Sequence, residues 1–184
     1  MFALSHLNET SAEDAAQCGL NEIEHFSRCD IAWKEANEGE DDRLIDLFLE
    51  RGVIMNPTLG VWDRLGRAMD PVFLHDERRK WVHPTYLAIW ERVPYRRCEP
   101  APRLRYQALI PNLKRFLLRC HQREVVILAG TDSPFPNLIP GFSLHDELAS
   151  YVDAGIPPVD ALRSATSVNA RVLGLESAIG RIAP

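Results

Sequence analysis

The fold is decided by the stretch VVILAGTD, residues 125–132. Its first five residues form an uninterrupted apolar run, the strongest strand candidate in the chain. A helix is predicted directly upstream, where four residues recur at the spacing of one helical face: Leu113, Phe116, Leu117 and Cys120. The strand therefore follows a helix and leads to the carboxylate of Asp132.

Three shorter strand candidates precede this one, at residues 2–6, 21–25 and 53–57. Each is followed by a helical pattern. Ser11 predicts the start of the helix after the first strand, and Gly19 predicts its end. Strands that alternate with helices are typical of βαβ units and indicate a parallel sheet.

Two more helices are predicted downstream of residue 132. Ser143 is expected to cap the first, with Asp146 at the capping-box position and Gly155 at its end. Pro157 and Pro158 are expected to open the second, since proline suits the first helical position.

The middle of the chain, residues 62–111, is rich in Trp, Arg and Pro and is mostly helical by pattern. It is too long for an ordinary βα loop, so we expect a helical insertion over one face of the core. A complete (β/α)₈ barrel needs about 250 residues. With 184 residues and four strand candidates, the chain corresponds to about half of such a barrel.

The composition is typical of a globular protein and does not indicate a strongly charged partner. Apolar residues make up 46% and charged residues 26% of the chain, and the net charge of −5 is mildly acidic. We therefore expect neither nucleic acid nor a membrane as partner. The first residues lack the pattern of a signal peptide, which predicts a cytoplasmic location. The four cysteines show no CxxC spacing, which argues against a zinc ribbon.

Three polar side chains stand where three of the four strand candidates end. His6 ends the first strand, His25 ends the second, and Asp132 follows the last. The carboxyl ends of parallel barrel strands form one face, so we expect these side chains to converge. Two imidazoles and one carboxylate in one place predict a site for Zn²⁺ or a similar divalent metal.

The sequence also resembles a known family. Residues 128–184, LAGTDSPFPNLIPGFSLHDELASYVDAGIPPVDALRSATSVNARVLGLESAIGRIAP, are similar to the end of an amidohydrolase-superfamily barrel. The similarity is to the branch that contains imidazolonepropionase and the Xaa-Pro dipeptidase-like amidohydrolases. Two upstream pieces resemble the same branch in the same order: SHLNETSAEDAAQCGLNEIEH, residues 5–25, and GVIMNPTL, residues 52–59.

This resemblance implies the C-terminal half of a TIM-like (β/α)₈ metal-dependent hydrolase barrel, with strands five to eight and their helices. Residues 1–184 would then be a partial amidohydrolase-related domain. His6 and His25 match the metal-binding histidines that end strands five and six. Asp132 matches the carboxylate that ends strand eight, binds the metal and acts as general base. The implied reaction is hydrolysis of a carbon–nitrogen bond, in a cyclic amide or a dipeptide-like substrate, by metal-activated water.

The family pattern contains further elements that these 184 residues do not. They are an HxH pair on the first strand, a carboxylated lysine or a glutamate on the fourth, and a β-sandwich after the barrel. A half barrel exposes unpaired strand edges, so we expect self-association or pairing with the missing barrel half. The alternative is a catalytically inactive, truncated or split-barrel fragment that needs a partner chain.

Other residues near the strand ends are candidates for supporting roles. His145 and Asn56 are expected at the rim of the pocket that takes the small-molecule substrate, and Thr58 could face the same pocket. Thr131 and Ser133 are expected to orient the carboxylate between them by hydrogen bonding.

Two other enzyme classes fit less well. A phosphate-binding barrel half needs a glycine-rich loop at a helix start, whereas residues 133–141, SPFPNLIPG, are rich in proline. A Ser-His-Asp hydrolase of the α/β-hydrolase type needs a GxSxG turn, which the sequence does not contain.

Overall fold

The computed structural model describes residues 2–26, 28–29, 38–92 and 100–182. Its sheet is parallel and contains β1 (Leu4–Ser5), β2 (Glu22–Glu24) and β3 (Ile54–Asn56), in that spatial order. These strands lie at the first three positions predicted from the sequence. The fold is therefore mixed α/β with a small parallel sheet.

The fourth predicted strand, residues 125–129, is only partly formed. It lies parallel to β3 through a single bridge between Met55 and Ile127. Two backbone hydrogen bonds of 2.9 and 2.8 Å join Met55 to its neighbours across this bridge. The ladder stops there because Pro57, the next residue of the partner segment that would donate, has no N–H, and the N–H of Gly130 donates instead to the side chain of Asn56. The prediction of a full strand was wrong, although its place beside β3 fits a continuing parallel order.

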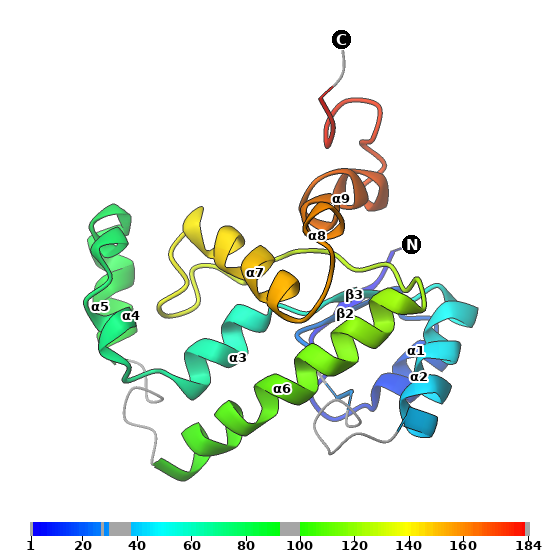
Figure 1. Cartoon of the computed structure of the whole chain (residues 1–184), viewed down its shortest axis with the longest axis horizontal. Helices are drawn as coiled ribbons and strands as arrows, with labels where there is room; N and C mark the ends of the chain where they lie inside the picture. The colour runs from blue at the N-terminus through cyan, green and yellow to red at the C-terminus, as the bar shows by residue number, and fades with distance from the viewer. Residues whose placement is uncertain (1, 27, 30–37, 93–99, 183–184) are drawn as a thin grey trace.

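The rest of the described structure is mostly helical. The helices in the described residues are α1 (Ala12–Gln17), α2 (Glu38–Arg51), α3 (Leu59–Gly66), α4 (Pro71–Leu74), the 3₁₀ helix η2 (Glu77–Trp81), α5 (Pro84–Arg92), α6 (Pro100–Gln122), α7 (Phe142–Asp153), α8 (Pro158–Ala165) and α9 (Ser167–Val172). Figure 1 shows α4 and α5 at one end of the molecule and α1 and α2 at the other, with the long helix α6 running between these ends. None of the helices in the described part of the chain combines the length and the apolar character needed to cross a membrane.

The predicted helix ends agree with the structure in four places. The Oγ of Ser11 accepts a hydrogen bond from the N–H of Asp14 at 3.0 Å, and Gly19 follows α1 with φ +87°. Gly155 follows α7 with φ +101°, and α8 begins at Pro158. At these positions local chemistry alone determines where the helix begins or ends.

The predicted cap at Ser143 was wrong. Helix α7 begins at Phe142, with Gly141 at the N-cap position, so Ser143 lies inside the helix and is 2% exposed. Asp146 is not available for a capping box, because its carboxylate pairs with Arg64 and Arg78. These ion pairs join segments that are far apart in the sequence, so a local sequence pattern cannot predict them.

The main core lies between α6 and the sheet. All four residues of the predicted α6 stripe are fully buried: Leu113, Phe116, Leu117 and Cys120. They share one apolar cluster with Ile23 of β2 and Met55 of β3. Burial of these side chains orients the strands, and with them the residues that follow each strand.

A second, smaller apolar cluster forms around Trp90 of α5, with Val82 and Ile139. Trp90 is 1% exposed, and its indole N–H donates to the carbonyl of Pro134 at 2.9 Å. The described residues of 62–111 are largely helical, and this cluster attaches them to the loop that follows residue 132. Their interpretation as an insertion stays a prediction.

Candidate functional site

Two of the predicted ligands lie side by side at the carboxyl ends of adjacent strands. His6 follows β1 and His25 follows β2, and β1 pairs with β2 in parallel. The centroids of the two imidazole rings are 4.9 Å apart, with an interplanar angle of 59°. His6 is exposed and His25 half-buried, so the pair is open to solvent on the His6 side.

Asp132 is exposed and follows the segment that bridges to β3. Its charge acts on the His25 ring. Burial lowers the pKa of His25 below its usual 6.5, the negative charge of Asp132 opposes this, and His6 adds to the lowering. The three predicted residues therefore belong to one electrostatic neighbourhood.

The backbone is strained where strands lead into this neighbourhood. His25 has φ +61°, Thr58 has φ +45° and Asp132 has φ +55°. Left-handed backbone is uncommon for residues other than glycine, and for a β-branched residue such as threonine it is an outlier. Each such residue costs about 1–3 kcal/mol and is retained where the surrounding structure fixes it, often at functional sites.

Residues on and beside α3 hold His25 from two sides. The ring Nδ1 of His25 lies 2.5 Å from the Oγ1 of Thr58, which precedes α3. The indole N–H of Trp62, on α3, donates to the backbone carbonyl of His25 at 2.9 Å. Nδ1 is thereby engaged within the protein, which leaves Nε2 as the ring nitrogen for a ligand.

Strand β2, which leads to His25, carries two carboxyl groups, those of Glu22 and Glu24. Burial raises the pKa of Glu22, and burial together with the charge of Glu22 raises the pKa of Glu24 to about 7. Asn56 of β3 hydrogen-bonds Glu24, which favours the ionised form. Sequence analysis missed this pair, although two glutamates inside a short strand followed by histidine are visible in the sequence.

The donor types of His6, His25 and Asp132 suit a divalent metal, since imidazole and carboxylate are ordinary Zn²⁺ ligands. Within the described residues, however, no group of three or more His, Cys, Asp or Glu side chains is arranged closely enough to hold a metal ion. The chain thus supplies side chains of suitable chemistry for part of a metal-ligand set, and two of them, His6 and His25, lie side by side.

The other predicted residues have identifiable surroundings. Asn56 accepts a hydrogen bond from the N–H of Gly130 at 2.9 Å and lines a cavity of about 450 Å³. His145 is exposed on the first turns of α7. Ser133 bonds within its own loop, donating from N–H to Thr131 Oγ1 at 3.2 Å and from Oγ to the Leu138 carbonyl at 3.0 Å. Their roles at the rim and beside Asp132 stay predictions.

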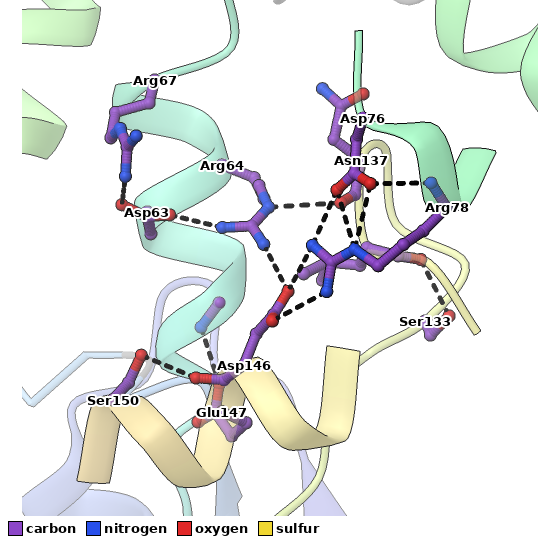
Figure 2. Close-up of polar contacts among 12 residues, drawn as sticks. Asp63, Arg64, Arg67, Asp76, Arg78, Ser133, Asn137, Asp146, Glu147 and Ser150 are labelled. Atoms are coloured by element: carbon purple, nitrogen blue, oxygen red, sulfur yellow. Dashed lines mark hydrogen bonds and ion pairs between the residues drawn. The ribbon is translucent and has the colours of Figure 1, made fainter. Parts of the chain in front are cut away.

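A charged network above α7 was missed by sequence analysis. Figure 2 shows the guanidinium of Arg64, on α3, between Asp63 and Asp146, with Arg78 on the other side of Asp146. Arg64 is 6% exposed, donates to the backbone carbonyl of Asn137 at 3.2 Å and lies 3.9 Å from the ring centroid of Phe73. The network ties the helices of residues 59–92 to the loop after Asp132. Its members are spread over the sequence, so no local motif revealed it.

No protein-family model matches the chain, and no curated protein matches it. Solved structures do match. A Xaa-Pro dipeptidase with bound methionine in its active site aligns with 100% of this chain at 19% identity and a TM-score of 0.60. A bottromycin amidohydrolase aligns with 98% at 22% identity and a TM-score of 0.66, and another amidohydrolase with 100% at 21% identity and a TM-score of 0.59.

The chain spans only part of these proteins: 36% of the dipeptidase, 43% of the bottromycin amidohydrolase and 35% of the third protein. At these identities the likeness concerns the fold. The resemblance first noted in the sequence is therefore confirmed in structure: over nearly its whole length, this chain is similar to a part of an amidohydrolase.

Proposed function

We propose that this chain corresponds to strands five to eight of an amidohydrolase barrel and contributes His6, His25 and Asp132 to a metal-dependent hydrolase site. The carrying observation is the adjacency of His6 and His25, with ring centroids 4.9 Å apart at the ends of parallel strands, within reach of the charge of Asp132. The proposed reaction is hydrolysis of a carbon–nitrogen bond in a cyclic amide or dipeptide-like substrate.

A divalent metal such as Zn²⁺ would supply Lewis acidity and lower the pKa of a water molecule. His25 would bind it through Nε2, because Nδ1 is held by Thr58. The exposed carboxylate of Asp132 would accept the proton of the attacking water and then return it to the leaving nitrogen. Both proton transfers use one side chain, which balances the proton count of amide hydrolysis.

The site would be completed by residues from outside the described set. The solved amidohydrolases are more than twice as long as the part that this chain matches. The second candidate is therefore a truncated or split-barrel fragment, which is catalytically inactive alone and needs a partner chain. The side chains of Phe2, just before the edge strand β1, and of Leu4, within it, are 51% and 58% exposed, which supports such pairing.

Hydrolysis assays distinguish the two candidates. The purified chain, with Zn²⁺ added, would be tested on Xaa-Pro dipeptides and on cyclic amides by amino-acid or ring-opening detection. A hydrolase that uses Asp132 as general base should lose turnover by roughly 10²–10⁴-fold on Asp132→Asn. His83→Ala is a matched control, since His83 is exposed before α5, away from the strand ends. A folded, metal-loaded chain without turnover would favour the fragment that needs a partner.

A further inference from the structure

Glu147 is a buried acid that the proposed chemistry does not use. It lies on α7 and is 1% exposed. Its two carboxylate oxygens accept hydrogen bonds from the backbone N–H groups of Leu59 and Gly60, at 2.6 and 2.7 Å. These are the first two residues of α3, so a side chain 88 residues further along satisfies the start of this helix (Figure 2).

Thr58 occupies the N-cap position of α3, where a threonine hydroxyl ordinarily accepts from an N–H of the first turn. Here Thr58 makes no side-chain capping bond. Its Oγ1 lies instead 2.5 Å from Nδ1 of His25. Glu147 provides the capping that Thr58 would otherwise give, and the Thr58 hydroxyl is thereby left for His25.

The packing around the capped end is close enough to fix it. A Cβ added to Gly60 would lie 3.0 Å from Leu138 Cδ2 and 3.3 Å from an oxygen of Glu147. Because glycine has no side chain, the Glu147 carboxylate can approach the backbone of Gly60 closely. Thr58 is 1% exposed, and its backbone is in the left-handed conformation. Such a conformation persists only where the surrounding residues hold it in place. One turn further, Trp62 holds the backbone carbonyl of His25.

We infer that Glu147 is a positioning residue for His25, because its capping of α3 frees the Thr58 hydroxyl to fix Nδ1 and so presents Nε2 to a ligand. That the ligand is a divalent metal rests on the proposed function. A histidine that binds a metal through Nε2 carries its proton on Nδ1 and donates it to a neighbouring acceptor, here Oγ1 of Thr58. Partners of this kind fix the tautomer and the ring orientation.

The coupling can be measured without metal. The ¹⁵N chemical shifts of the His25 ring would be recorded in the full metal-free chain at about pH 8, where the ring is neutral. Thr58→Val should shift the Nδ1 resonance, and Thr58→Ser should restore it because the hydroxyl is kept. Glu147→Gln, which replaces one acceptor oxygen by a donor, should shift Nδ1 in the same direction as Thr58→Val. In the Thr58→Val background, Glu147→Gln should add no further shift.

The matched control is Asp146→Asn. It also removes one charge from α7 and breaks a contact with α3, through Arg64, but it leaves the N–H groups at the helix start untouched. This variant should leave the His25 resonances in place. Should Glu147→Gln fail to fold, Glu147→Asp gives the same comparison, since it keeps the charge but shortens the reach to α3.

Zn²⁺ affinity gives a second readout that separates the inference from the proposed function. Glu147→Gln and Thr58→Val should each weaken Zn²⁺ binding about tenfold, and the double variant no more than either alone. An unchanged Nδ1 resonance in Glu147→Gln, beside a shifted one in Thr58→Val, overturns the positioning role. Expected shifts in a chain that does not bind Zn²⁺ support the positioning role and overturn the proposed function alone.

Discussion

At the scale of single residues, the site is marked by backbone strain as much as by residue type. His25, Thr58 and Asp132 all adopt positive φ shortly after a strand or a strand-like segment. Left-handed conformations of this kind persist where neighbours over-determine them. For His25 those neighbours are Thr58 and Trp62.

Two substitutions should shift the pKa of His25 in opposite directions. Asp132→Asn should lower it further, because an anion that favours the protonated ring is lost. His6→Gln should raise it, because a neighbouring imidazole that disfavours the charge is removed. Proton NMR titration of His25 in the metal-free chain measures both. A shift in the same direction for the two variants would contradict the arrangement.

Glu147 predicts how stability depends on pH. Burial raises its pKa from 4.5 to about 7, against the opposing effect of the N–H groups of Gly60 and Leu59 and the charge of Arg64. A carboxyl group with a raised pKa in the folded state binds more protons there than in the unfolded chain. The free energy of unfolding should therefore fall as pH rises from about 4.5 to about 7.

Glu147→Gln should flatten this dependence, by up to about 1.4 kcal/mol per pH unit within that window. Urea unfolding at several pH values measures the slope, and Glu24, which keeps its raised pKa, contributes equally to both proteins. Equal slopes in the wild type and the variant would show that Glu147 does not bind its proton in this range.

The sequence predicted part of the site because that part is local. His6, His25 and Asp132 each follow an apolar or strand-like stretch, and parallel strands bring their carboxyl ends together. The bond between Thr58 and His25 and the cap from Glu147 join residues 33 and 88 positions apart. Periodicity within one element carries no information about such pairs.

At the scale of elements, α6 supports the sheet and shows why most of the fold was predictable. Its apolar stripe appears in the sequence and is fully buried in the structure. The strand at residues 125–129 had the strongest apolar run, yet only Ile127 forms a bridge. Apolar character predicted its burial and place, whereas strand hydrogen bonding depends on partners that the run itself does not encode.

Two identical substitutions on α6 test this role. Leu117→Ala should lower the free energy of unfolding by about 2–5 kcal/mol, because Leu117 is fully buried in the main core. Leu104→Ala on the same helix should change it by less than about 0.5 kcal/mol, since Leu104 is 63% exposed. Urea denaturation followed by circular dichroism compares them. Similar losses for both would mean that α6 does not pack on the sheet as described.

At the scale of the whole molecule, apolar side chains are exposed near both edges of the parallel sheet, if the segment that bridges to β3 is counted as its last strand. Leu4 on β1 is 58% exposed, and Val126, in the segment next to β3, is 41% exposed. Leu4 also lines the cavity of about 450 Å³ together with Glu22 and Asn56. Exposed strand edges with apolar side chains favour pairing with another chain.

Self-association is the expected result for the isolated chain. Light scattering after size-exclusion chromatography should give a mass above that of the monomer, 20.9 kDa, at micromolar concentration. Leu4→Lys should shift the protein toward the monomer, because a charged residue on an edge strand opposes edge pairing. Leu104→Ala, exposed but remote from the strand edges, serves as control. A monomeric wild type would remove the support for a pairing surface at β1.

The most direct test of the metal site is equilibrium titration of the purified chain with Zn²⁺, followed by competition with a chromogenic chelator. The proposed function predicts that the chain binds Zn²⁺ through His25 and Asp132, with an affinity weakened at least about tenfold by His25→Ala and by Asp132→Ala. His75→Ala should leave it unchanged, since His75 is exposed at the end of α4. Binding that is equally strong in His25→Ala, Asp132→Ala and the wild type would contradict a metal site built on these residues.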